Sequence, residues 1–128
     1  MLAVIAVGGM LGAAARFKVA EALPTTAGHF PWATFWTNLS GSFLLGFVLV
    51  VLLARFPEAR NMRLFLATGI LGAYTTMSTF GVETALLVKD DDVTTALLYG
   101  LGSLAAGVFL AYAGIVAARV TVAGTSQR

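Results

Sequence analysis

Residues 69–80 read Gly-Ile-Leu-Gly-Ala-Tyr-Thr-Thr-Met-Ser-Thr-Phe and lie inside a long apolar segment. Two glycines followed by four serine or threonine residues make a poor helix interior, because these residue types have low helix propensity. We therefore expect a helix that covers this segment to be broken or kinked near Gly72 to Ser78.

The composition excludes a water-soluble domain. Only 11% of the residues are charged and 59% are hydrophobic, whereas soluble domains carry roughly 25% charged residues. The chain has no cysteine and a single histidine, so disulfides, thiolate metal sites and cysteine nucleophiles are excluded. No basic run could follow a nucleic-acid backbone. The composition predicts a protein embedded in lipid that is not an enzyme.

Four long apolar stretches with few charges predict four spanning helices, because a span needs roughly 20 mostly apolar residues. The aromatic residues at the start of the second stretch are typical of the headgroup level. The connections are too short to hold a second domain, and the N-terminus lacks the basic region of a signal peptide. We predict one all-α integral membrane domain over residues 1–128, with helices at about 2–23, 32–54, 64–88 and 93–118.

The charges at the two membrane faces are nearly balanced. With four spans, one face holds five Lys or Arg residues and the other holds three, so the usual positive-inside bias is small. A four-helix unit is also too small to enclose a pathway alone. We therefore expect a dual-topology, antiparallel homodimer.

Polar side chains recur every four residues on three of the predicted helices and so share one face of each. They are Thr34, Asn38 and Ser42, then Thr75, Thr79 and Glu83, and finally Thr95, Tyr99 and Ser103. Such stripes line a pathway or hydrogen-bond neighbouring helices. An acid such as Glu83 within a span indicates function by default, although Lys89 is near enough for Glu83 to lie at the interface.

Small residues spaced by four predict close helix packing, at Gly8 with Gly12 and at Ser103 with Gly107. The predicted break in the third helix would free backbone carbonyls at membrane depth. Such carbonyls are tolerated only within protein or beside a cavity, where a donor or a cation satisfies them.

These motifs resemble those of the CrcB/Fluc fluoride channels, which are four-helix proteins that work as antiparallel homodimers. The resemblance rests on Gly8 to Phe17, on Asn38 to Phe43 with Thr34, and on Tyr99 with Ser103. Its most specific part is Gly69 to Glu83, where the family reads close to GxxGGxTTFSTFxxE.

The resemblance implies a fluoride pore lined by rings and polar donors. Two paired phenylalanines of the family meet the anion with their ring edges, the positive part of the aromatic quadrupole. The second corresponds to Phe80, but the first is Met77, whose thioether has no such quadrupole. The other pore positions implied by the resemblance are Asn38, Ser78, Thr79, Tyr99 and Ser103.

The resemblance also implies a structural sodium ion at the dimer centre, held by main-chain carbonyls that correspond to Gly72 and Thr75. Ala73 replaces the usual second glycine there. Arg16 corresponds to a cation at an aqueous vestibule, where it would attract anions. Glu83 would repel anions if ionised, so it is expected to shape one entrance of the pore or to control access to it.

The implied function is a passive, fluoride-selective channel in the bacterial cytoplasmic membrane. Hydrogen fluoride enters neutral and ionises in the less acidic cytoplasm, and a negative-inside potential then drives the anion outward. No phosphate-binding GxxxxGK[ST] string is present, and none is required. Two alternatives stay open: a proton-coupled exporter of the small multidrug-resistance type with Glu83 as the coupling acid, and a non-conducting or heteromeric subunit of the same fold.

Overall fold

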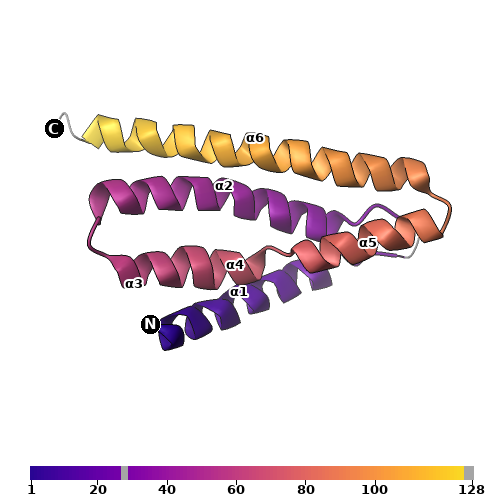
Figure 1. The fold of residues 1–128 in the computed structure, drawn as a ribbon, viewed down its shortest axis with the longest axis horizontal. Helices are drawn as coiled ribbons and strands as arrows, with labels where there is room; N and C mark the ends of the chain where they lie inside the picture. Colours follow the sequence, from indigo (N-terminus) through magenta and orange to yellow (C-terminus); the bar gives the residue numbers. More distant parts are fainter. Residues whose placement is uncertain (27–28, 126–128) are drawn as a thin grey trace.

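The computed structural model describes residues 1–26 and 29–125, and the regular structure in these residues is helical (Figure 1). The third of the four passes is divided into segments. The elements are α1 (Leu2–Ala22), α2 (Trp32–Arg55), α3 (Arg60–Arg63), the π-helix η1 (Leu64–Leu71), α4 (Gly72–Tyr74), α5 (Met77–Lys89) and α6 (Val93–Thr125).

Three of these helices are long and apolar enough to cross a membrane within the described part of the chain, namely α1, α2 and α6. The third pass begins at Arg60, earlier than the predicted residue 64. Helix α6 extends to Thr125, although the sequence predicted its end near residue 118. Its 33 residues span about 50 Å at 1.5 Å per residue, which exceeds the roughly 30 Å of bilayer hydrocarbon. Helix α6 is therefore longer than an untilted span requires.

The four passes alternate in direction, so both termini lie at the same end of the molecule (Figure 1). Helix α2 packs along α6, and α1 packs along η1 and α4. Helix α5 follows the break and contacts the first half of α6 (Figure 1). The third pass is thus divided between two sets of neighbours, and the division falls at its break.

Glycines allow close helix contact between α1 and η1. A Cβ atom added to Gly8 would lie 2.6 Å from the carbonyl oxygen of Phe65, and one added to Gly12 would overlap the carbonyl of Ile70. These contacts confirm the predicted role of the Gly8–Gly12 pair. The prediction that Gly107 allows close helix packing is wrong, because a Cβ atom added there would meet only Ser42 Oγ, at 3.7 Å.

Replacing Gly12 by alanine is expected to destabilise the protein by roughly 1–3 kcal/mol, the usual cost of overpacking. The clash is with backbone, which cannot rotate away as a flexible side chain would. Thermal unfolding of the purified protein in detergent measures the effect. Gly102→Ala is the matched control, since an added Cβ there meets nothing within 4 Å. Equal melting temperatures for the two variants would show that α1 does not pack against the η1 backbone as closely as the structure indicates.

The start of α6 is fixed by Asp92. The Thr95 N–H donates to Asp92 Oδ1 at 3.0 Å, as in a helix N-cap. Hydrogen bonds from Thr95 hold the pKa of this exposed carboxyl below its usual value. A lowered folded-state pKa stabilises the protein above the ordinary carboxyl pKa, and this stabilisation is lost as the pH falls through the lowered value.

Candidate functional site

The third pass breaks at two extended residues. Thr75 has φ −75° and ψ 156°, and Thr76 has φ −147° and ψ 120°, so neither continues the helix. Helix α4 ends before them and α5 begins at Met77. The predicted break near Gly72 to Ser78 is confirmed, and it is confined to the centre of that range.

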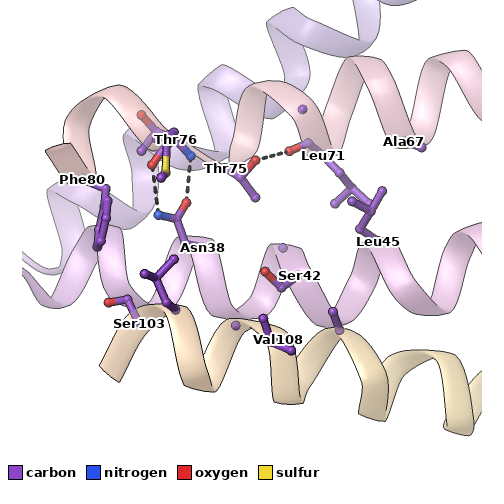
Figure 2. Close-up of a pocket in the computed structure, with 16 residues that line it drawn as sticks. Asn38, Ser42, Leu45, Ala67, Leu71, Thr75, Thr76, Phe80, Ser103 and Val108 are labelled. Atoms are coloured by element: carbon purple, nitrogen blue, oxygen red, sulfur yellow. Dashed lines mark hydrogen bonds between the residues drawn. The ribbon is translucent and has the colours of Figure 1, made fainter. Parts of the chain in front are cut away.

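The side chain of Asn38 on α2 holds the break from across the bundle. Its Nδ2 donates to the Thr76 carbonyl at 3.0 Å, and its Oδ1 accepts from the Thr76 N–H at 2.8 Å (Figure 2). One amide thus satisfies both backbone groups of an extended residue that has no helical partners. The Asn38 amide group carries two N–H bonds, so one donor remains for another acceptor.

The hydroxyl of Thr76 caps α5. Its Oγ1 accepts from the Thr79 N–H at 3.2 Å and lies 3.0 Å from Thr79 Oγ1. On the other side of the break, Thr75 Oγ1 donates to the Leu71 carbonyl at 3.0 Å. The two threonines therefore replace part of the helical hydrogen bonding that the break removes.

The carbonyls of Gly72 and Thr75 are among those that lose their usual helical donors at the break. The donor for Gly72 would be the Thr76 N–H, which donates to Asn38 instead. The donor for Thr75 would be the Thr79 N–H, which donates to the Thr76 hydroxyl. Both of these main-chain oxygens could therefore accept a hydrogen bond from a donor or bind a cation. No cluster of His, Cys, Asp or Glu side chains in the described residues could hold a metal ion.

A pocket of about 430 Å³ lies between the break, α2 and α6, and we call it the first pocket (Figure 2). It brings together six of the residues predicted to form the fluoride pore or the sodium site. They are Asn38, Gly72, Thr75, Met77, Phe80 and Ser103. The rest of its wall is mostly apolar, so few polar groups reach it.

Ser103 brings an unsatisfied hydroxyl to the first pocket. The residue is 8% exposed, and its Oγ has no hydrogen-bond partner among the described residues. A buried hydroxyl without a partner costs free energy, and serines in spanning helices usually bond to a backbone carbonyl or a neighbouring helix. Ser103 instead offers its hydrogen bond to whatever occupies the pocket.

A second pocket, of about 510 Å³, lies on the other side of the break, and we call it the vestibule pocket. Its lining is richer in polar groups, with Arg16 at the end of α1 and the threonines of α2. The polar lining residues are Arg16, Thr25, Thr34, Thr37, Thr76, Thr79 and Glu83. Thr76 lines both pockets, so the segment that Asn38 holds forms part of the wall between them.

Glu83 joins three helices at the edge of the vestibule pocket. Thr34 on α2 donates to its Oε1 at 3.0 Å, and the Tyr99 hydroxyl on α6 donates to its Oε2 at 2.7 Å. Its carboxylate is thus satisfied by hydroxyl donors from neighbouring helices. The two donors are the predicted stripe residues of α2 and α6, which shows that part of each stripe bonds to another helix.

The structure places the remaining predicted site residues apart from the first pocket. Thr79 lines the vestibule pocket, and Ser78 is exposed with its Oγ 3.4 Å from Thr76 Oγ1. Tyr99 is completely buried and lines neither pocket. Sequence analysis did not single out Thr37, which lines the vestibule pocket. Its position three residues after Thr34, on the same helix face, was the available signal.

Residues 3–115 match the family described as "CrcB-like protein, Camphor Resistance (CrcB)". The chain belongs to this CrcB-like family. The match covers both pockets and the break, and with its long apolar helices this CrcB-like chain is a multi-pass membrane protein.

Several bacterial proteins resemble the CrcB-like chain over most of its length. "Fluoride-specific ion channel FluC 2" of Streptomyces avermitilis is 42% identical over 99 residues, which are 77% of this chain and 63% of that protein. "Fluoride-specific ion channel FluC 3" of the same organism is 40% identical over 96% of this chain and 60% of its own length. "Fluoride-specific ion channel FluC" of Chlorobium chlorochromatii is 40% identical over 90% of this chain and 89% of its own length. The CrcB-like chain thus spans less than two thirds of the Streptomyces relatives.

Proposed function

We propose that this chain is a subunit of a passive, fluoride-selective channel. The observation that carries the proposal is the first pocket, where the unpartnered Ser103 hydroxyl and the spare N–H of Asn38 are both available as donors. Donors in a mostly apolar wall favour a small anion that can replace its water with hydrogen bonds. The names of the relatives, which are fluoride-specific channels, support the choice of anion.

The rings and the vestibule complete the proposed path. Phe80 lines the first pocket beside these donors, and a ring edge is the part of an aromatic side chain that attracts an anion. Arg16 in the vestibule pocket would raise the local anion concentration. Ser78, Thr79 and Tyr99 are the other proposed pore residues. The negative-inside potential supplies about 2.3 kcal/mol per charge per 100 mV, so passive export from a bacterial cytoplasm requires no coupling.

The proposed channel is an antiparallel homodimer. The first pocket opens on the surface of the chain, and Met77 on its rim is 71% exposed although it lies in an apolar segment. One chain therefore supplies only part of a wall around this pocket. A second copy, inserted in the opposite direction, would close it, and the small charge bias between the two faces is compatible with both orientations.

We propose that the main-chain oxygens at the break bind a structural sodium ion. The carbonyls of Gly72 and Thr75 have both lost their helical donors, and unwound carbonyls at membrane depth are suited to sodium. In the dimer, the positive charge of the ion would attract the carbonyl oxygens at the break of each copy and so hold the two breaks together. Asn38 and Thr76 would hold the backbone in the conformation that exposes these carbonyls.

Fluoride efflux from liposomes containing the purified protein tests the proposal. A fluoride electrode follows release after a potassium shunt is opened, beside a chloride assay and a series with imposed pH gradients. Rapid fluoride release without chloride, independent of the pH gradient, is the expected result. Flux that requires a proton gradient would instead favour the coupled exporter, and no flux from a folded protein would favour a silent or heteromeric subunit.

Restoring the ring at position 77 is expected to raise the fluoride flux. Met77→Phe would place a second ring edge one helical turn before Phe80, and we expect an increase of roughly threefold, equivalent to ~0.7 kcal/mol. The electrode assay measures it, with Met77→Leu as the control for side-chain size. Equal flux for the phenylalanine and leucine variants would show that the quadrupole does not act at this position.

A further inference from the structure

The connection between α1 and α2 packs one aromatic side chain, Phe30, against the helix bundle. Pro31 has φ −78° and ψ 74°, and the Trp32 N–H donates to the Phe30 carbonyl at 2.9 Å. These values describe an inverse γ-turn centred on a proline whose ring fixes φ. Pro31 is also fully buried. The backbone of Phe30 is therefore set rigidly relative to the first turn of α2.

The ring of Phe30 contacts Tyr99 on α6. The two ring centroids are 5.3 Å apart with an interplanar angle of 81°, an edge-to-face arrangement. The same Tyr99 ring contacts Phe80 with centroids 5.0 Å apart. Phe30 and Phe80 both pack against the buried cluster that Tyr99 forms with Leu87 and Ala96. Tyr99 is thus in contact with a loop ring and with a ring of the first pocket.

Tyr99 also connects the vestibule pocket to this cluster, because its hydroxyl donates to Glu83 at 2.7 Å. A tyrosine has two side-chain torsions, and the contacts with Phe30, Phe80 and Glu83 restrain both of them. Removing the Phe30 ring would open space beside Tyr99, into which its ring could turn. Such a turn would change the support of Phe80 and the hydrogen bond to Glu83 together.

We propose that Phe30 is a positioning residue for conduction, which acts through Tyr99 on both pockets without lining either. It holds the Tyr99 ring so that Phe80 keeps its place in the first pocket and Glu83 keeps its hydroxyl donor beside the vestibule pocket. This inference rests on the proposed channel function. It concerns a residue outside the pore, in a connection that would otherwise serve only to join two helices.

Fluoride efflux per folded protein tests this inference, with wild-type flux measured first. A wild-type protein without flux would contradict the channel function itself, whereas the inference is judged on variants of a conducting protein. We expect Phe30→Leu to lower the flux about tenfold and Phe30→Tyr, which keeps the ring, to stay within about twofold. Trp32→Leu is the matched control. It removes a half-exposed ring whose centroid lies 4.5 Å from that of Phe30, and it should leave the flux within about twofold.

A double-substitution cycle distinguishes positioning from general support of the fold. If Phe30 acts through Tyr99, then adding Phe30→Leu to Tyr99→Leu should lower the flux no further. Phe30→Met, a flexible residue of similar size, provides a second ringless variant should the leucine variant unfold. Flux unchanged in a folded ringless variant would overturn the proposal, and so would a full tenfold further loss in the Tyr99→Leu background.

Discussion

Asn38→Leu is expected to lower the fluoride flux by at least about 100-fold, which corresponds to ~2.7 kcal/mol. Leucine has a similar size but neither donates nor accepts. It would leave the Thr76 N–H and carbonyl without their partners, at about 1–3 kcal/mol for each unsatisfied group. The extended conformation at the break would relax, and the wall that Thr76 forms between the two pockets would move with it. The proteoliposome electrode assay measures the loss.

Two further variants control this experiment. Ser40→Ala removes another polar side chain of α2, one that bonds to the Trp36 carbonyl of its own helix and lies 3.0 Å from the Tyr74 hydroxyl, and it should leave the flux within about threefold. Asn38→Asp keeps an acceptor for the Thr76 N–H but removes the donor to the Thr76 carbonyl. An ionised aspartate would also repel the anion, so this variant should not conduct. Substantial flux through Asn38→Leu would show that the break holds its shape without the amide.

Glu83→Leu is expected to cause a similar loss of flux, again by roughly 100-fold. The hydroxyls of Thr34 and Tyr99 both donate to this carboxylate, and leucine would leave them without acceptors. Tyr99 is completely buried, so its hydroxyl cannot form a hydrogen bond to water instead. We expect its ring to shift, which would disturb Phe80 and the vestibule pocket at the same time.

Glu83→Gln separates the structural role of this residue from proton coupling. Glutamine keeps one acceptor oxygen for these hydroxyls, and its NH2 group can donate to the other. A passive channel should therefore keep a flux within about tenfold of wild type and show no dependence on an imposed pH gradient. A coupled exporter would lose transport completely, because glutamine cannot carry a proton. Complete loss in the glutamine variant, together with gradient-driven transport in the wild type, would contradict the channel.

The helices and the break followed from local sequence because each depends on local physics. A charge-free apolar run needs a hydrogen-bonded backbone in lipid, which predicts a helix wherever the run is long enough. The segment from Gly72 to Ser78 contains a glycine and three serine or threonine residues, which have low helix propensity, and this predicts the break. The end of α6 was placed too early because Arg119 and the polar residues after it resemble a tail. In the structure Thr121 Oγ1 bonds to the carbonyls of Ala117 and Ala118, and the helix continues.

The partners within the site could not be predicted from spacing. A four-residue period places Thr34 and Asn38 on one face of α2, but it does not say that one bonds to Glu83 and the other to the Thr76 backbone. Tyr99 and Ser103 share a face of α6 for the same reason. Only the structure shows that Tyr99 is fixed by Glu83 whereas Ser103 has no partner in the described residues.

Local sequence was enough to predict that this protein lies in a membrane, that it forms four apolar helical segments, and that the third is interrupted at its threonines. These features depend on solvation by lipid and on the conformational preferences of neighbouring residues, which are local properties. Only the tertiary structure shows which hydrogen-bond donors have acceptors and which have none, because this depends on how helices distant in sequence pack together. Such contacts place the Asn38 amide against the Thr76 backbone, Thr76 between the two pockets, and the Phe30 ring against Tyr99.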